Sequence, residues 1–370
     1  MRPSLRYVAV LVIAVAAVLA SAVSTAAAPR RDALRAALDK VVATGVPGTI
    51  AYARHGAATI WLARGEGNLA ARTPIRRHDR FRIGSVTKTF LAAVVLQLVA
   101  EGKLALDDPV ERFLPSVVPN GSAITIRQLL QHTAGLFDYA NDGDTTILQP
   151  YLNGDFAYYW SPQQLLAVAF AHDPHFAPGT SWRYCNTCYI VLGLVVEAVT
   201  GHPVGAALRQ RIFRPLGLAH TTFARKPEIA GRHTHGYILL DKPPLLDTSV
   251  FSPSSVWAAG AIVSTADDVA RFYRALLRGR LLPPRLLAEM KTTVATGMGN
   301  RYGLGILTAD LPCGAAWGHE GDFTGYETFA LTSKDGRRQL VLLVNLDQEV
   351  GQSKKAQRAI VDALIAGYCG

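Results

Sequence analysis

The stretch from Phe81 to Glu101 constrains the fold more than any other part of the sequence. A short apolar run ends before Gly84, and a long helical pattern begins at Ser85. Between Thr89 and Leu98 this pattern is mostly apolar, so we expect a helix that is buried in the middle of its domain. The rest of the chain must therefore pack around this helix.

The first turn of the expected helix carries two groups that suit nucleophilic catalysis. Ser85 lies where backbone N–H groups are unpaired and the helix dipole is positive, which favours an alkoxide and a developing oxyanion. Lys88 lies on the same face one turn later, and a buried lysine has a lowered pKa and can act as a base. The pair predicts a nucleophile and its proton acceptor. The ordinary alternative is a capping serine followed by a solvated lysine.

The N-terminal residues have the composition of a secretory signal. Arg2 and Arg6 precede an apolar run from Tyr7 to Ala20, and small residues follow as far as Ala28. The run is short for a membrane span, so we expect a signal peptide at residues 1–28, its cleavage, and a secreted chain without a membrane anchor. The remainder is long enough for one large domain.

The charge and composition of the chain limit the classes of partner that we expect it to bind. It has 38 Lys and Arg residues against 28 Asp and Glu residues, a formal net charge of +10. The basic residues are dispersed and do not alternate with aromatic residues in a stripe, so nucleic acid is not an expected partner. Hydrophobic residues make up 49% of the chain and charged residues 18%, an ordinary globular profile. We expect a monomer.

Strand patterns lie at both ends of the chain and helical patterns in the middle. Strands are expected at residues 49–52, 59–63, 302–307, 316–320, 327–332 and 339–346. Helices are expected at 29–44, 126–132, 161–171, 189–200, 205–213, 264–277 and 353–365. The economical fold is α/β (α+β), with one antiparallel sheet built from both ends and flanked by helices. We expect one domain at residues 29–370, with an all-helical subdomain inserted at roughly 102–255.

A third group must pass a proton to the leaving atom, and a tyrosine can do this. Tyr-x-Asn occurs three times, beginning at Tyr139, Tyr151 and Tyr184. Spacing alone does not choose among them. We select Tyr184 because the Pro178-Gly179 turn and the following helix would hold it rigidly, whereas the other two lie in an expected long loop. Asn186 is placed to cap that helix.

The cysteines and the possible metal ligands favour disulfides over a metal site. Four cysteines lie in the part expected to be exported, where an even number favours disulfides. Cys185 and Cys188 have C-x-x-C spacing, but no second such pair completes a zinc site, and their state stays open. His319-Glu320 begins like a zinc-protease motif but lacks its second histidine. We therefore expect no metal and no cofactor.

Three elements occur in order along the chain: Ser85-x-x-Lys88, Tyr184-x-Asn186 and His319-x-Gly321. In this order the chain resembles the penicillin-recognising serine hydrolases, which include the D-alanyl-D-alanine carboxypeptidases and the class C β-lactamases. Segments 129–136, 176–186 and 260–268 are also similar to this family. The resemblance covers nearly the whole mature chain and implies a β-lactamase/transpeptidase-like fold, an α/β sandwich with an all-helical subdomain.

The resemblance also implies roles for the site residues. Ser85 would be acylated, while Lys88 and Tyr184 would share the proton transfers, with the identity of the general base left open. Asn186 would hold the substrate amide. His319 would stand where other branches have the lysine of a Lys-Thr-Gly triad.

The oxyanion hole, the cleft wall and a disulfide are also expected at particular residues. The N–H groups of Ser85 and Asp322 would form the oxyanion hole. Gly321 would let substrate approach the backbone closely, and Trp257 is a candidate for the wall of the cleft. The resemblance to related carboxypeptidases also implies a disulfide between Cys313 and Cys369.

Glu320 departs from the family pattern, because it replaces the threonine of a His-Thr-Gly version. That threonine looks like part of the binding site for the substrate carboxylate, so Glu320 would repel a substrate with a free C-terminus. Two alternatives stay open. Glu320 projects to the far face of its strand, since neighbouring residues alternate, or it pairs with an arginine such as Arg301.

The predicted function is an exported serine hydrolase similar to D-alanyl-D-alanine carboxypeptidases. Its substrates would be small peptides or esters, expected to derive from peptidoglycan, and β-lactams would acylate it. The same machinery would also serve an esterase, a D-aminopeptidase or a β-lactamase. A non-enzymatic peptidoglycan-binding or sensor protein is the third alternative, and the intact Ser85, Lys88 and Tyr184 argue against it.

Overall fold

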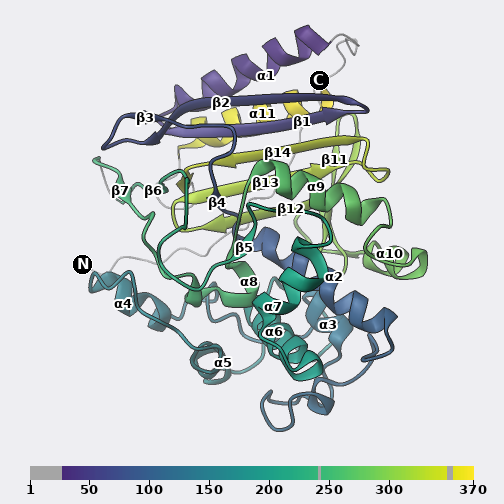
Figure 1. Ribbon diagram of the computed structural model, residues 1–370. Helices are drawn as coiled ribbons and strands as arrows, with labels where there is room; N and C mark the ends of the chain where they lie inside the picture. The colour runs from purple at the N-terminus through teal and green to yellow at the C-terminus, as the bar shows by residue number, and fades with distance from the viewer. Residues whose placement is uncertain (1–26, 241–242, 348–352) are drawn as a thin grey trace.

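The computed structural model describes residues 27–240, 243–347 and 353–370. Apart from Ala27 and Ala28, the predicted signal segment lies outside the described residues. The centre of the molecule is a nine-stranded antiparallel sheet of order β3-β2-β1-β14-β13-β12-β11-β10-β9 (Figure 1). Its strands are β1 (Gly48–His55), β2 (Ala58–Asn68), β3 (Thr73–Pro74), β9 (Val294–Ala295), β10 (Arg301–Tyr302), β11 (Leu307–Leu311), β12 (Gly314–Phe323), β13 (Tyr326–Thr332) and β14 (Arg338–Val344).

The two ends of the chain meet in the middle of this sheet. β1 pairs with β14, in a register that joins Thr49 to Val344, and β2 continues the sheet beyond β1. β14, β13 and β12 follow as successive antiparallel neighbours. The predicted fold class, an antiparallel sheet assembled from both ends of the chain, is confirmed.

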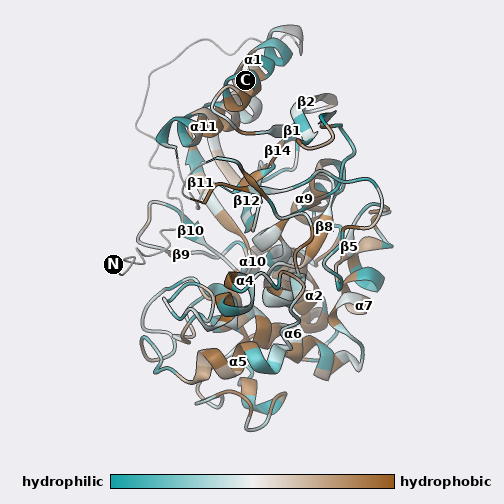
Figure 2. Ribbon diagram, turned by 90° about the vertical axis from the view of Figure 1, so that its left-hand side faces the viewer, coloured by the Kyte–Doolittle hydropathy of each residue, from teal (hydrophilic) through white to brown (hydrophobic). Residues whose placement is uncertain are grey.

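Helices cover both faces of the sheet. α1 (Ala27–Val42) and α11 (Lys354–Cys369) pack together on one face (Figures 1 and 2). The alternation of strand residues separates two cores. In β14, Leu340 and Leu342 belong to the smaller core under α1 and α11, whereas Val341 and Leu343 belong to the larger core on the other face.

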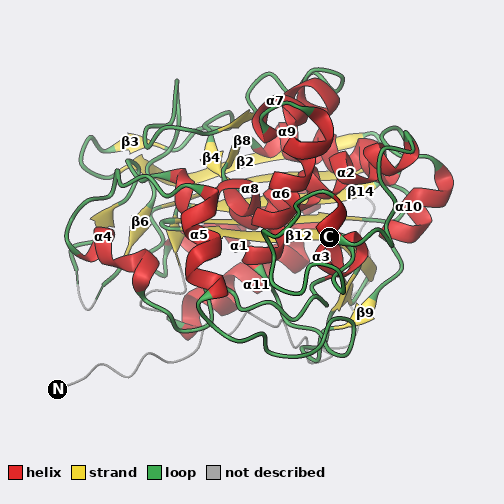
Figure 3. Ribbon diagram, turned by 90° about the horizontal axis from the view of Figure 1, so that it is seen from below, coloured by secondary structure: helices red, strands yellow, loops and turns green. Residues whose placement is uncertain are grey.

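The larger core lies around α2 (Thr87–Ala100), which carries Lys88 and follows the short helix η1 (Gly84–Val86). Every residue from Thr87 to Leu96 is buried, so the expectation of a buried helix is correct. In the view from below, helices lie in front of the sheet (Figure 3). They are α3 (Ile126–Gln131), α4 (Gln149–Leu152), α5 (Pro162–Phe170), α6 (Asn186–Thr200), α7 (Val204–Leu208), α8 (Trp257–Gly260), α9 (Ala266–Leu277) and α10 (Pro284–Met290).

Short elements complete the fold. Single turns are η2 (Val110–Arg112), η3 (Thr146–Leu148), η4 (Arg209–Phe213) and η5 (Pro253–Ser255). One small sheet joins β15 (Leu346–Asp347), β6 (Tyr237–Ile238) and β7 (Leu246–Asp247), and another joins β4 (Phe81–Arg82), β8 (Ile262–Ser264) and β5 (Thr222–Phe223). Among the described residues, no single helix is long and apolar enough to cross a membrane. The two helices Asn186–Thr200 and Val204–Phe213, which are bent against each other, reach that length and apolar composition only when taken together.

One predicted strand is wrong. Residues 302–307 form the end of β10, a bend and the start of β11 rather than one continuous strand. Gly305 has a φ of +73°, which few residues other than glycine adopt. A Cβ there would overlap Ala92 on α2, so the bend lets the chain pass directly over the central helix.

Candidate active site

Ser85 lies at the point where the central helix approaches the sheet. It belongs to η1, which packs against β12. Gly84 has a φ of +48°, and a Cβ on it would overlap the carbonyl oxygen of Asp322 and lie 2.7 Å from its nitrogen. A Cβ on Gly321 would lie 3.0 Å from the Ser85 nitrogen. These two glycines therefore allow the close approach that brings the Ser85 and Asp322 backbones together, as an oxyanion hole requires.

Lys88 is fully buried beneath Ser85 and uses all three of its donors. Its Nζ donates to Ser85 Oγ at 2.9 Å, to Asn186 Oδ1 at 2.8 Å and to the Ala259 carbonyl at 3.0 Å. Burial lowers the pKa of Lys88 to about 7, and the charge of Asp138 acts in the opposite direction. A lysine with this pKa can receive the proton of Ser85 near neutral pH.

Tyr184 is the Tyr-x-Asn tyrosine that lies at Ser85. Its ring centroid is 4.8 Å from Lys88 Nζ, and it lines the same cavity as Ser85, whose side chain acts to lower the Tyr184 pKa. Burial raises its pKa well above the ordinary value, so it carries its proton at neutral pH. Tyr139 instead donates to the Ser255 carbonyl at 2.7 Å, and Tyr151 packs against Phe251.

Asp138 extends the polar network behind the nucleophile, and sequence reasoning missed it. Asn186 Nδ2 donates to Asp138 Oδ2 at 3.0 Å while its Oδ1 accepts from Lys88. Asp138 is fully buried, and burial raises its pKa to about 6. The sequence offered no signal beyond an acidic residue next to the Tyr139-x-Asn141 candidate, because only the fold brings Asp138 to Asn186.

His319 lies on β12 beside the nucleophile and is also buried. Its Nε2 is 2.8 Å from the hydroxyl of Tyr302, and its Nδ1 contacts the Glu320 carbonyl. Burial, together with the charge of Lys88, lowers the pKa of His319 to about 3. This residue is therefore neutral at pH 7 and supplies no positive charge. Sequence reasoning had assigned Tyr302 only to a strand.

These groups open onto a cavity of about 220 Å³. Its wall includes Ser85, Tyr184, Asn186, Trp182, Tyr302, Asn141, Asn300, Met298, His319, Gly321, Glu320, Asp322 and Glu327. The described lining residues thus include three carboxylates and no lysine or arginine. One carboxylate oxygen from each of Asp322, Glu327 and Asp347 lies within 4.8 Å of the other two, which is close enough for a single metal ion to bind all three.

A family model described as Beta-lactamase matches residues 32–365. The chain belongs to the β-lactamase family. The predicted family is thus confirmed, and it is a family of serine hydrolases. Esterase EstB from Burkholderia gladioli is 34% identical over 298 residues, which cover 72% of this chain and 76% of that protein.

Two solved structures extend the comparison. A D-stereospecific amidohydrolase from a Streptomyces species is 40% identical with a TM-score of 0.82, covering 92% of this chain and 99% of its own. The D-amino acid amidase of Ochrobactrum anthropi SV3, complexed with L-phenylalanine amide, is 27% identical with a TM-score of 0.79. That match covers 91% of this chain and 98% of the amidase.

One candidate of the sequence lies elsewhere in this β-lactamase-family protein. Trp257 does not line the cavity at Ser85. Its ring lies against Gly193 on α6 and lines a second cavity of about 1120 Å³, so we do not include it in the candidate site. Its neighbours on α8 do face Ser85, because Ala259 and Gly260 line the first cavity and Ala259 accepts from Lys88.

Glu320 combines features of the alternatives that its sequence left open. It pairs across the sheet with Phe329, which belongs to the core under α11, so its side chain lies on the face opposite Gly321. It nevertheless lines the cavity, and its charge raises the pKa of Tyr184. Arg301, the arginine that the sequence suggested as a partner of Glu320, donates hydrogen bonds to the hydroxyl and the backbone carbonyl of Thr293.

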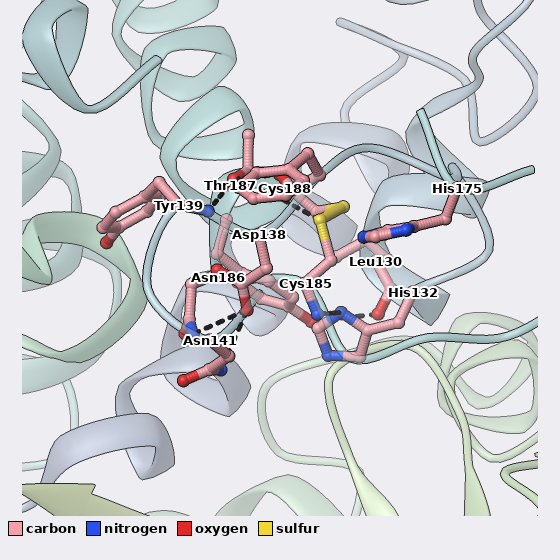
Figure 4. The surroundings of a disulfide bond; sticks show 12 residues. Leu130, His132, Asp138, Tyr139, Asn141, His175, Cys185, Asn186, Thr187 and Cys188 are labelled. Carbon is pink, nitrogen blue, oxygen red and sulfur yellow. Dashed lines mark hydrogen bonds between the residues drawn. A yellow bond between two sulfur atoms is a disulfide. The ribbon is translucent and has the colours of Figure 1, made fainter. Parts of the chain in front are cut away.

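Two disulfides support the site from different sides. Cys313 and Cys369 are bonded, as the resemblance implies, and join the turn before β12 to the end of α11. Cys185 and Cys188, whose state the sequence left open, are bonded to each other at the start of α6. Cys185 lies between Tyr184 and Asn186, and its backbone N–H donates to His132 Nδ1 at 3.1 Å (Figure 4).

Proposed function

We propose that this protein hydrolyses amides and esters through an acyl-enzyme on Ser85 and prefers substrates without a negative charge near the scissile bond. Amides and esters of D-amino acids are the first candidates. The observation that carries this proposal is the cavity at Ser85, whose described lining residues include three carboxylates and a neutral His319 but no lysine or arginine.

The proposed mechanism uses the contacts around Ser85. Neutral Lys88 accepts the proton of Ser85 across their 2.9 Å hydrogen bond while Oγ attacks the substrate carbonyl. Tyr184 then donates a proton to the leaving nitrogen or oxygen, and the N–H groups of Ser85 and Asp322 stabilise the oxyanion. The second hydrogen on Asn186 Nδ2 holds the substrate amide. Water releases the acyl group by the reverse sequence.

Charge distinguishes the candidate substrates. A peptide that ends in free D-alanine brings a carboxylate to the bond being cleaved, where Glu320 would repel it in a partly desolvated cavity. An amino acid amide has no carboxylate and carries an ammonium group, which an acidic wall attracts. The similar proteins include an esterase, a D-stereospecific amidohydrolase and a D-amino acid amidase, which supports esters and amides as the substrate class.

D-alanyl-D-alanine carboxypeptidase activity, which the sequence predicts, is the second candidate. The Asn186 amide and the His319-x-Gly321 strand favour it, since they suit a peptide substrate. β-Lactams would acylate Ser85 under either candidate. We also propose export, because two disulfides suit an oxidising compartment.

The test compares kcat/KM for D-phenylalanine amide, its L-enantiomer, D-phenylalanine methyl ester, and an N-acyl-D-Ala-D-Ala peptide as free acid and as amide. We expect the free acid to be at least about tenfold slower than its amide, which corresponds to about 1.4 kcal/mol. Ser85→Ala is the control for background hydrolysis. A free-acid peptide that is the best substrate would reverse the order of the two candidates.

A further inference from the structure

We propose that Asp138 is a positioning residue that fixes the orientation of the Asn186 amide and, through it, controls the proton on Lys88. The inference rests on the proposed function, in which Lys88 is the base for Ser85. It assigns a role to a buried acid that does not itself touch the reacting atoms.

A continuous buried chain links Asp138 to the nucleophile. Asn186 Nδ2 donates to Asp138 Oδ2 at 3.0 Å, and Lys88 Nζ donates to Asn186 Oδ1 at 2.8 Å and to Ser85 Oγ at 2.9 Å. Figure 4 shows Asp138 beside Asn186 and Asn141. An ionised carboxylate only accepts hydrogen bonds, so it turns the amide N–H₂ of Asn186 toward itself and the amide oxygen toward Lys88.

The carboxylate of Asp138 is itself held in place. Its Oδ1 accepts from the Ala140 N–H at 3.1 Å, and its Oδ2 also accepts from Asn141 Nδ2 at 2.9 Å. The Asp138 N–H donates to Asp142 Oδ2 at 2.6 Å. With three donors on the carboxylate, Asp138 cannot turn away from Asn186 without leaving buried groups unpaired.

Few charged groups other than Asp138 lie close enough to influence the proton on Lys88. The titratable groups that face Lys88 or Asp138 are Tyr184, Tyr189, His132, His319, Tyr139 and Asp142. The histidines have lowered pKa values and the tyrosines raised ones, so these six are neutral near pH 7 except Asp142. Asp142 is ion-paired with Arg183, and its carboxylate contacts His175 Nε2. Asp138 is therefore the anion that acts on Lys88 from within the buried network.

The direction of the effect follows from charge. Burial lowers the pKa of Lys88 to about 7, and the Asp138 anion opposes this lowering. Without that anion the pKa of Lys88 would fall further, and the amide of Asn186 would be free to rotate. Lys88 would then be neutral at lower pH, but the amide oxygen of Asn186, which accepts a hydrogen bond from Lys88, would be poorly oriented.

The test is the pH profile of kcat/KM for a neutral ester in Asp138→Asn, which keeps the size of the side chain and removes its charge. We expect kcat to fall at least about tenfold and the acidic limb to move down by about one pH unit. Asp142→Asn is the matched control, because Asp142 contacts Asp138 but does not act on Lys88. It should lower the melting temperature without moving the limb.

An Asp138→Asn enzyme that loses activity with an unmoved limb would overturn the proposal, because a merely structural role predicts that result. If this variant does not fold, ¹³C-lysine NMR of the wild-type enzyme gives the answer without turnover. The Lys88 resonance, identified by its loss in Lys88→Met, should titrate in two steps that belong to the coupled pair. One simple step would refute the coupling, whereas failure of any ester or β-lactam to acylate Ser85 would refute the proposed function.

Discussion

At Lys88, burial and the charge of Asp138 shift the pKa in opposite directions. Burial lowers its pKa to about 7 from an ordinary value of 10.5. If neutral Lys88 is the base, wild-type kcat/KM for a neutral ester should rise about tenfold per pH unit below pH 7 and level off above it. The unfolded chain binds the extra proton between pH 7 and 10.5, so the Lys88 contribution to stability should rise with pH across that window. A pH-independent rate between pH 5 and 8 would contradict this assignment.

The tyrosines offer a matched pair of substitutions. Tyr184→Phe should lower kcat by about a hundredfold or more, the usual scale for general acid–base catalysis. Tyr139→Phe removes a hydroxyl that donates to the buried Ser255 carbonyl, so it should cost about 1–3 kcal/mol of stability and little activity. Steady-state kinetics and urea unfolding measure the two effects. The reverse pattern would show that Tyr139 is the proton donor.

At the scale of single residues, the sequence predicted the groups that share a local motif. Ser85 and Lys88 are one helical turn apart, and Tyr184 and Asn186 begin one helix, so spacing along the chain was sufficient to associate each pair. Asp138 reaches Asn186 only through the packing of the loop after α3 against α6, which leaves no periodic signal. Trp257 illustrates the same limit, because its aromatic character did not reveal which of two cavities it lines.

Among the elements, the contact between η1 and β12 carries the geometry of the site. Gly84→Ala would add a Cβ that overlaps Asp322, and would also strain a φ of +48°. We expect a loss of at least about a hundredfold in kcat/KM, comparable to removing an oxyanion-hole donor. Gly56→Ala is the control, because Gly56 has a φ of +61° but no atom within 4 Å of the new Cβ.

Gly56→Ala should therefore cost about 1–2 kcal/mol of stability and leave the rate unchanged. Similar rate losses in both variants would mean that backbone strain, and not the contact with β12, explains the effect.

The predicted elements that proved correct were those with clear periodicity, such as the buried α2. The strand predicted at 302–307 proved wrong because Gly305 bends over Ala92, a tertiary contact that no local pattern records.

On the scale of the whole molecule, the chain ends stabilise the sheet that supports the site. α1 and α11 cover one face, and the Cys313–Cys369 bond joins α11 to the hairpin of β11 and β12. The sequence could predict this arrangement in outline, because strands and helices at both ends have nowhere else to bury their apolar faces. It could not derive the pairing of cysteines from spacing, and the resemblance to a family supplied that pair.

The two disulfides should separate stability from activity. Cys313 and Cys369 are 56 residues apart, and the chain-entropy estimate for such a loop is about 4 kcal/mol, so replacing both by alanine should lower the urea midpoint strongly. Activity below the unfolding transition should change little, because neither residue lines the cavity. Cys185 and Cys188 are three residues apart, for which the same estimate is roughly 2 kcal/mol. Replacing this pair should cost less stability but more activity, because Cys185 lies between Tyr184 and Asn186. Equal losses of activity in the two double variants would show that the short disulfide does not position the catalytic segment.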